Sequence, residues 1–126
     1  MIVGTGIDLC EVARIRASIA RFGDRFLRRC FTPSEIAYCQ SKANSEERFA
    51  ARFAAKEAAM KALGTGFSGG VSWQHFNIGH ARGGRPTLAL SGRAAEIATA
   101  IGVARIHLSL THTAEHGMAF VIFEND

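Results

Sequence analysis

Four charged side chains lie close together in one stretch of helical composition, RFAAKEAAMKALGTG, residues 52 to 66. Glu57 is the only acid there, among the bases Arg52, Lys56 and Lys61. Magnesium usually takes one or two carboxylates together with phosphate oxygens, and bases can neutralise those phosphates. The competing interpretation is a surface ion pair between Glu57 and Lys61, four residues apart. The stretch therefore predicts either a phosphate-binding metal site or a solvated helix face.

A second carboxylate, Asp8, follows an apolar stretch in the segment GIDL. A carboxylate at the end of a strand is often only the cap of the next helix. If Asp8 instead converges with Glu57, the two can hold one magnesium ion. The turn Gly64-Thr65-Gly66 comes directly after the helix, and its bare backbone could approach a ligand closely.

The histidines near the C-terminus suggest a metal site less strongly than their number implies. His107 and His112 have opposite parity in one continuous strand, so they face opposite sides of the sheet. We therefore do not expect a zinc site of three histidines. The polar end of this strand predicts either an exposed strand face, or a phosphate contact or general base; its residues are Ser109, Thr111, His112 and Thr113.

The net charge of +4 comes entirely from one early segment, residues 11–29, which holds six arginines and two acids. A basic patch favours an anionic partner: nucleic acid, a membrane surface or an acidic protein. If one helix runs through Gly23 and Asp24, four arginines share the side opposite Val12, Ile15 and Ile19; they are Arg14, Arg21, Arg25 and Arg28. A non-catalytic module that binds RNA or an acidic protein is the alternative to an enzyme. Phe22 and Phe26 lie on the apolar side, which is poor for stacking on bases.

The order of elements predicts an α+β fold in which an antiparallel β-sheet packs against a long helix and shorter helices. Strands are expected at IVGTGI, VSWQHFNI, PTLAL, RIHLSLTHT and GMAFVIF, with a turn at AEH between the last two. A helix follows from Val12, and a capping box at Thr32 to Glu35 opens another. The long helix should run from 45 to 63 with its start at Asn44 and its stop at Gly64, and Ser91 should cap a helix that ends at Gly102.

Composition excludes several classes of protein. No apolar run approaches the ~20 residues that a membrane span needs, and the N-terminus lacks the features of a signal peptide. Three cysteines without a CxxC argue against a disulfide framework and for a reducing, cytoplasmic setting. The sequence has no P-loop, GxSxG or HExxH motif, and Gly4-Thr5-Gly6 lacks the third glycine of a dinucleotide fingerprint. We expect one domain over residues 1–126.

Four segments, in this order, resemble the holo-acyl-carrier-protein synthases, the small 4′-phosphopantetheinyl transferases. They are GIDLCEVARI (6–15), RFAAKEAAMKALGTG (52–66), GRP (84–86) and SLTHT (109–113). The resemblance covers the whole chain and implies the fold of that family. It also implies the reaction: Mg²⁺-dependent transfer of 4′-phosphopantetheine from coenzyme A to a serine of apo acyl carrier protein, releasing adenosine 3′,5′-bisphosphate, within fatty acid biosynthesis.

The resemblance further implies roles for particular residues. Asp8 and Glu57 would hold the metal, and Glu57, Lys61 and His112 would be catalytic, with the proton acceptor left open between Glu57, a metal-bound water and His112. The coenzyme A contacts would be Arg52, Lys61, Gly64, Thr65, Gly66, Pro86, His112 and Thr113. The arginine side, Arg14, Arg21, Arg25 and Arg28, would dock the acidic carrier protein. The family's trimer, with cofactor clefts between protomers, is expected here too, without nucleic acid or membrane partners.

Overall fold

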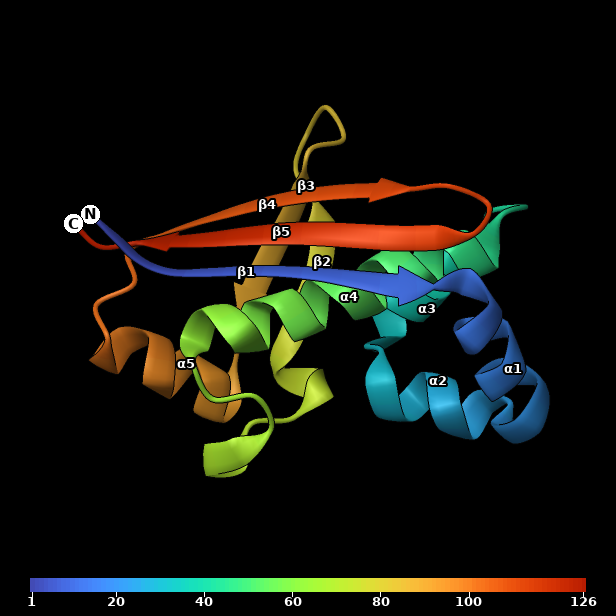
Figure 1. Cartoon of the computed structure of the whole chain (residues 1–126), viewed down its shortest axis with the longest axis horizontal. Coiled ribbons are helices and arrows are strands. Elements are labelled where there is room, and N and C mark those ends of the chain that lie inside the picture. Colours follow the sequence, from blue (N-terminus) through green and yellow to red (C-terminus); the bar gives the residue numbers. More distant parts are fainter.

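The computed structural model describes all 126 residues and is built around one three-stranded antiparallel sheet (Figure 1). Its strands are β1 (Ile2–Glu11), β5 (His116–Glu124) and β4 (Arg105–His112), in the order β1-β5-β4. The long helix α4 (Ser45–Leu63) crosses one face of this sheet. A second sheet pairs β2 (Phe76–His80) with β3 (Pro86–Leu90). The predicted α+β architecture is confirmed.

The close approach of β1 to α4 comes from small residues on both elements. Every second residue of β1 faces the helix, and glycine is present at Gly4 and Gly6. A Cβ at Gly4 would overlap the carbonyl oxygen of Ala62, and one at Gly6 would overlap that of Ala58. The alanine-rich side of α4 therefore lies directly against the strand. This approach decides how near the next inward residue of β1, Asp8, comes to the helix.

The first helical segment is two helices, not one. α1 (Val12–Phe22) and α2 (Asp24–Cys30) are separated by Gly23, whose φ of 57° lies in the left-handed region that glycine tolerates. The predicted alignment of four arginines along one continuous helix is therefore wrong. The capping box that opens α3 (Pro33–Gln40) is confirmed, with the Thr32 side chain and Glu35 each accepting a backbone N–H.

The predicted bounds of α4 are confirmed at both ends. Gly64 adopts the left-handed conformation, with φ 80°, immediately after the helix. Asn44 precedes the helix, but its side chain does not cap it and accepts a hydrogen bond from Arg48 Nε instead. Three large apolar residues of α4, Phe49, Phe53 and Met60, are buried in the core.

The middle of the chain differs in detail from the expected strands. The segment predicted as one strand, VSWQHFNI, begins with a 3-10 turn, η2 (Trp73–His75), and only then continues as β2. Another turn, η1 (Ser68–Gly70), precedes it. α5 (Gly92–Ala100) follows Ser91, but the Ser91 side chain makes no cap hydrogen bond. The C-terminal hairpin β4–β5 is confirmed, with its turn at residues 113–115.

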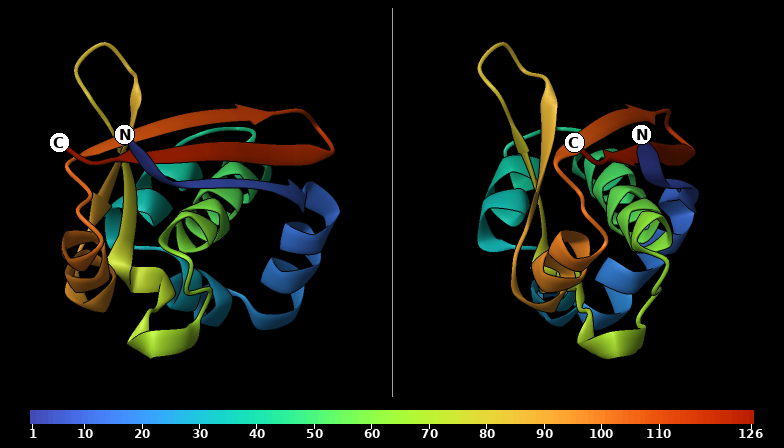
Figure 2. Two further views of the ribbon diagram at one scale, coloured as in Figure 1. Left: turned by 60° about the vertical axis from the view of Figure 1, so that its left-hand side comes forward. Right: turned by 90° about the vertical axis from the view of Figure 1, so that its left-hand side faces the viewer.

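One face of the three-stranded sheet is covered by α4, whereas no element of the chain lies over the other face (Figures 1 and 2). The termini lie side by side at one end of this sheet, where the Asn125 N–H donates to the Met1 carbonyl over 2.9 Å. No helix of the structure is long and apolar enough to span a bilayer.

Candidate active site

Asp8 lies within β1 and faces α4, between Gly6 and Cys10 on the same side of the strand. It does not cap a helix, because α1 begins only after Glu11. Its Oδ1 lies 2.9 Å from the ammonium nitrogen of Lys61, which also donates to the Ile7 carbonyl over 3.0 Å. The interpretation of Asp8 as a cap is therefore wrong, and the strand carboxylate meets α4 as the metal hypothesis requires.

Glu57 lies in the same cluster, on the turn of α4 before Lys61. Burial, followed by the negative charge of Asp8, raises the pKa of Glu57, whereas Arg14 and Lys61 oppose this rise. The carboxylates of Asp8 and Glu57 therefore interact electrostatically with Arg14 and Lys61 where β1, α1 and α4 meet. Glu57 makes no ion pair with Lys61, so the interpretation as an i,i+4 surface pair is wrong.

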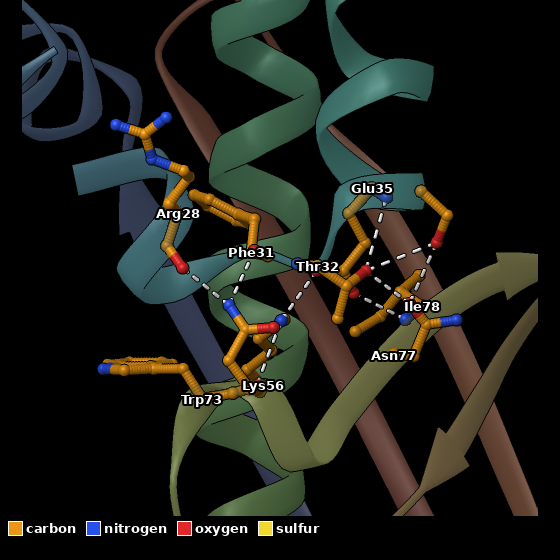
Figure 3. A network of polar contacts seen from close by, with 10 residues as sticks. Arg28, Phe31, Thr32, Glu35, Lys56, Trp73, Asn77 and Ile78 are labelled. Atoms are coloured by element: carbon orange, nitrogen blue, oxygen red, sulfur yellow. Dashed lines mark hydrogen bonds and ion pairs between the residues drawn. The ribbon is translucent and has the colours of Figure 1, made fainter. Parts of the chain in front are cut away.

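Lys56, predicted to neutralise phosphates, is not available for that role. Its ammonium group is fully buried and lies 2.7 Å from the carboxylate of Glu35, which is also fully buried (Figure 3). The sequence around Lys56 does not indicate that Glu35 of α3 lies opposite it. This expectation is wrong, since neither group faces solvent.

Arg52 is buried on another side of α4, about 140° around the helix from Glu57. Its guanidinium carbon lies 4.5 Å from the centre of the Tyr38 ring, and its Nη2 lies 3.3 Å from His80 Nε2. Lys42 and Arg48 also approach the Tyr38 ring, and Arg52 Nε has no hydrogen-bond partner. Arg52 therefore belongs to a second basic cluster and not to the one at Asp8.

The remaining residues expected to contact coenzyme A lie apart from one another within one chain. Gly64, Thr65 and Gly66 continue from the end of α4, one turn beyond Lys61. Pro86 begins β3 and lines a hollow of about 560 Å³ that also includes Arg85, His107 and Ser109. A single chain thus presents these residues on separate surfaces.

His112 lies at the end of β4, two strands away from β1, which is a separation of roughly 9.5 Å. It faces α4, and its Nδ1 lies 3.0 Å from a carboxylate oxygen of Glu47. Thr113 belongs to the turn that follows, where its hydroxyl accepts the N–H groups of Glu115 and His116. His107 lies on the opposite face and pairs with Glu124, so the predicted split of the two histidines is confirmed.

The basic helices border a groove of about 510 Å³ rather than forming one stripe. Arg14, Arg25 and Arg29 line it together with aromatic rings that sequence reasoning did not assign to the site: Phe22, Phe26, Phe53, Phe67 and Trp73. Arg28 faces a different hollow, beside Asp24 and Pro33, and Arg21 packs on the ring of Phe22. Of the four predicted docking arginines, only Arg14 and Arg25 line the groove.

Arg14 connects the groove with the carboxylate cluster. Its guanidinium lies over the Phe53 ring, 5.4 Å from the ring centre, and its charge acts on Glu57 one turn further along α4. In the sequence, Arg14 is notable only because it belongs to the segment GIDLCEVARI. Nothing in that segment indicates that Arg14 lies near Glu57. Arg14 therefore lines the groove and also interacts electrostatically with Glu57.

The donor set at Asp8 and Glu57 fits a magnesium ion. Both side chains offer hard carboxylate oxygens. Two carboxylates suit Mg²⁺, because phosphate and water oxygens complete the coordination of this ion. Lys61 lies beside these carboxylates. Its side chain is 56% exposed, so it can contact phosphate oxygens from the solvent side. The arrangement is suited to binding and polarising a phosphate ester or anhydride.

Comparisons with known proteins identify the family of the chain. A family model described as the 4′-phosphopantetheinyl transferase superfamily matches residues 4–121. The holo-acyl-carrier-protein synthase of Koribacter versatilis is 62% identical over 125 residues, covering 99% of this chain and 100% of its own. The crystal structure of the synthase from Neisseria meningitidis has a TM-score of 0.90 at 34% identity, covering 99% of this chain and 100% of its own.

A further solved structure, the Helicobacter pylori holo-acyl-carrier-protein synthase in complex with coenzyme A, has a TM-score of 0.83 at 32% identity. It covers 95% of this chain and 99% of its own. The match thus extends over the whole fold and includes both β1 and α4, which carry the two carboxylates. The chain therefore belongs to the holo-acyl-carrier-protein synthases of the 4′-phosphopantetheinyl transferase superfamily.

Proposed function

We propose that this protein transfers 4′-phosphopantetheine from coenzyme A to a serine of apo acyl carrier protein, with Asp8, Glu57 and Lys61 at the reacting centre. The observation that carries this proposal is the convergence of a strand carboxylate, a helix carboxylate and a lysine at the β1–α4 contact. The products are holo acyl carrier protein and adenosine 3′,5′-bisphosphate.

The reaction forms one bond and breaks one bond at the same phosphorus. The serine hydroxyl oxygen attacks the phosphorus that carries pantetheine, and the bond to the bridging oxygen of the pyrophosphate breaks. Lys61 stabilises the negative charge that develops on the leaving phosphate. The serine proton must pass to a base, and in this chain a Glu57 oxygen that does not hold the metal is the candidate acceptor at the reacting centre. His112 would act only from a neighbouring chain, since Glu47 holds it elsewhere.

Magnesium would be held by Asp8 and Glu57. When bound there, the ion supplies Lewis acidity to the pyrophosphate. The ammonium of Lys61 already neutralises Asp8 across the β1–α4 contact. Binding of a divalent ion would therefore compete with this ion pair and leave Lys61 free to turn towards a phosphate oxygen.

The residues proposed to contact coenzyme A lie on separate surfaces of a single chain. Lys61 and the turn of Gly64, Thr65 and Gly66 suit one part of the molecule, because they lie in series at the end of α4. Arg52, Pro86, His112 and Thr113 suit another part, and the cluster around Arg52 is rich in positive charge without an acid partner. We infer that coenzyme A lies between neighbouring chains, each of which supplies one set.

The open face of the three-stranded sheet supports such an assembly, which we propose is a homotrimer. Ile7, Leu9, Met118 and Phe120 are all exposed on this face and lie next to one another, since Ile7 pairs with Phe120 and Leu9 with Met118. A contiguous apolar surface on a sheet is typical of a surface that another protein covers. A further copy of this chain is the occupant that would also complete the coenzyme A site.

The groove between α1, α2 and Trp73 is the proposed docking site for the carrier protein. Acyl carrier proteins are acidic, so the arginines Arg14, Arg25 and Arg29 would attract them, while the exposed rings of Phe22 and Phe67 would contact apolar side chains. Arg14 leads from this groove to Glu57, so a serine docked there would approach the reacting centre. We propose a cytoplasmic location, supported by three cysteines that are buried and free.

The test of the proposed function is direct. The purified protein is incubated with coenzyme A, Mg²⁺ and an apo acyl carrier protein, and the carrier is analysed by mass spectrometry. We expect the mass gain of one phosphopantetheine group on the serine and the appearance of adenosine 3′,5′-bisphosphate. No mass gain with active carrier protein would contradict the proposal and favour a non-catalytic basic module.

A further inference from the structure

A network of polar contacts joins α3, α4, β2 and the η2 turn, outside the reacting centre (Figure 3). At its middle the Lys56 ammonium lies 2.7 Å from Glu35 Oε1, and both side chains are completely buried. The same ammonium donates to the main-chain carbonyl of Trp73 over 3.1 Å. Lys56 thereby joins α4 to the start of α3 and to the η2 turn.

Glu35 extends the set to two further backbone positions. Its Oε1 accepts the N–H of Thr32 over 2.7 Å, and its Oε2 accepts the N–H of Ile78 in β2 over 2.6 Å. Both oxygens of the Glu35 carboxylate thus accept hydrogen bonds from within the protein. A single glutamate closes the helix cap, fixes the second sheet and neutralises Lys56.

The η2 turn also holds the end of α2. Gln74 Nε2 donates to the carbonyls of Arg28 and Phe31, each over 2.7 Å. The indole of Trp73 stacks on the ring of Phe53, with centres 4.6 Å apart, and meets Phe67 edge-on at 4.7 Å. The turn therefore sets the Trp73 ring against Phe53 and Phe67, which also line the groove, and holds the end of the helix that carries Arg25.

A buried ion pair of this kind needs an explanation other than stability. Taking two charges out of water is unfavourable, and apolar side chains of similar volume are often as stabilising. The pair instead fixes the relative positions of neighbouring elements, because its hydrogen bonds reach backbone groups at the start of α3, in β2 and in the η2 turn. Lys56 is also the neighbour of Glu57 in the chain.

We infer that Lys56 is a positioning residue for the transfer reaction: with Glu35 and Gln74 it fixes the η2 turn and the end of α2 against α4, so that the docking groove keeps one geometry relative to Glu57. The inference rests on the proposed function for its kinetic consequence. The structural part, a fixed position of Trp73, does not need that function.

The test separates position from stability with two variants. Lys56→Met alone leaves the Glu35 carboxylate buried without its cation, so it should lower the melting temperature. Lys56→Met combined with Glu35→Gln removes both buried charges and should recover part of that loss. Recovery is incomplete because the amide can accept only one of the two backbone N–H groups that Glu35 accepts, and the hydrogen bond to the Trp73 carbonyl is still missing. For the double variant we expect the KM for carrier protein to rise about tenfold, while the KM for coenzyme A changes less than about twofold.

Trp73 is the only tryptophan in the chain, so its fluorescence reports on the η2 turn alone. In the double variant, without any substrate, its emission should shift to longer wavelength and acrylamide should quench it more strongly. This measurement stays valid even if the wild type transfers nothing, which would refute the proposed function separately. Gln74→Leu, which keeps the Lys56–Glu35 pair, should raise the KM for carrier protein in the same direction.

Arg82→Met, which removes one exposed positive charge from the β2–β3 loop, is the matched control and should leave both readouts unchanged. A double variant with a recovered melting temperature, wild-type emission and wild-type KM for the carrier would overturn the inference. A shift in emission with unchanged KM would overturn it as well, because the turn would then move without effect on docking. If the double variant stays too unstable to measure, the same two readouts are taken on Lys56→Gln, and wild-type emission with a wild-type KM for the carrier would overturn the inference.

Discussion

The ammonium group of Lys61 makes its ion pair with Asp8, 2.9 Å away on β1, and none with Glu57, one turn earlier on its own helix. A second hydrogen bond, to the Ile7 carbonyl over 3.0 Å, fixes the same group against the strand. The contact therefore bridges the two elements that carry the carboxylates. Gly4 and Gly6 make it possible, because larger side chains would hold the strand away from α4.

Replacing Lys61 with alanine should impair catalysis more than folding. The removed ammonium would otherwise face the leaving phosphate, and loss of one such preorganised donor typically lowers kcat by about 100-fold to 1000-fold. Lys61 is more than half exposed, so the melting temperature should change little. Steady-state kinetics and thermal denaturation check both parts. Unchanged kcat and KM for coenzyme A would show that Lys61 is only a surface residue.

The metal prediction uses Glu57→Gln, which keeps the shape of the side chain and removes its charge. Transfer should be abolished in a protein that stays folded. Mg²⁺ should raise the melting temperature of the wild type, because a ligand at 100 times its Kd stabilises the folded state by about 2.7 kcal/mol. The same titration should have little effect on Glu57→Gln or Asp8→Asn.

Glu96→Gln is the matched control, since Glu96 is an exposed acid of α5 that pairs only with Arg93. It should keep both the activity and the response to Mg²⁺. Full activity of Glu57→Gln at ordinary Mg²⁺ concentrations would remove Glu57 from the metal site.

Local sequence patterns were enough to predict the elements that carry the site. Gly64 marks the end of α4 because glycine tolerates the left-handed conformation there, and Thr32 with Glu35 marks the start of α3. Alternation along β4 correctly separated His107 from His112. In each case the signal depends on residues close together in the chain, which is where propensity and periodicity are informative.

Contacts between distant segments could not be predicted in the same way. A helical wheel places Lys56 beside the core, but only the packing of α3 shows that Glu35 neutralises it. The arginine stripe failed because Gly23 turns the chain between α1 and α2. The groove depends on Trp73 reaching Phe53, twenty residues earlier, and no periodic pattern encodes that contact.

His80 should make stability depend on pH. Loss of hydration, followed by the positive charges of Arg52, Arg48 and Lys42, lowers the pKa of His80 from its ordinary value of 6.5. The unfolded chain binds a proton near pH 6.5 while the folded protein resists it, so the free energy of unfolding falls as the pH drops from there through the lowered pKa.

His80→Gln should therefore flatten the dependence of melting temperature on pH. The variant and the wild type are compared by thermal denaturation from about pH 8 to about pH 5, and the wild type should lose more on acidification. Parallel curves would show that the cations near His80 do not resist its protonation.

The open sheet face gives a prediction about assembly. Phe120→Glu places a charge at the centre of the exposed apolar surface, where it should prevent burial against another chain. Size-exclusion chromatography with light scattering should show a trimer for the wild type and a monomer for the variant, which should also lose transfer activity. Ala100→Glu adds the same charge at the exposed end of α5 and should leave the trimer intact. A monomeric and fully active wild type would contradict both the trimer and the shared coenzyme A site.

The docking groove is tested by two arginines of the same short helix. Arg25 lines the groove and Arg28 faces another hollow, so Arg25→Glu and Arg28→Glu change the net charge equally at different places. Both are exposed, and we expect each to change stability by no more than about 0.5 kcal/mol. Arg25→Glu should raise the KM for carrier protein steeply and leave the KM for coenzyme A unchanged, because opposite charge governs encounter with an acidic partner. Arg28→Glu should raise the KM for carrier protein less, and Arg14→Glu combined with Arg25→Glu should make recognition almost independent of salt.

Equal effects of Arg25→Glu and Arg28→Glu would mean that only the overall positive charge attracts the carrier. No effect of either would place docking on a different surface.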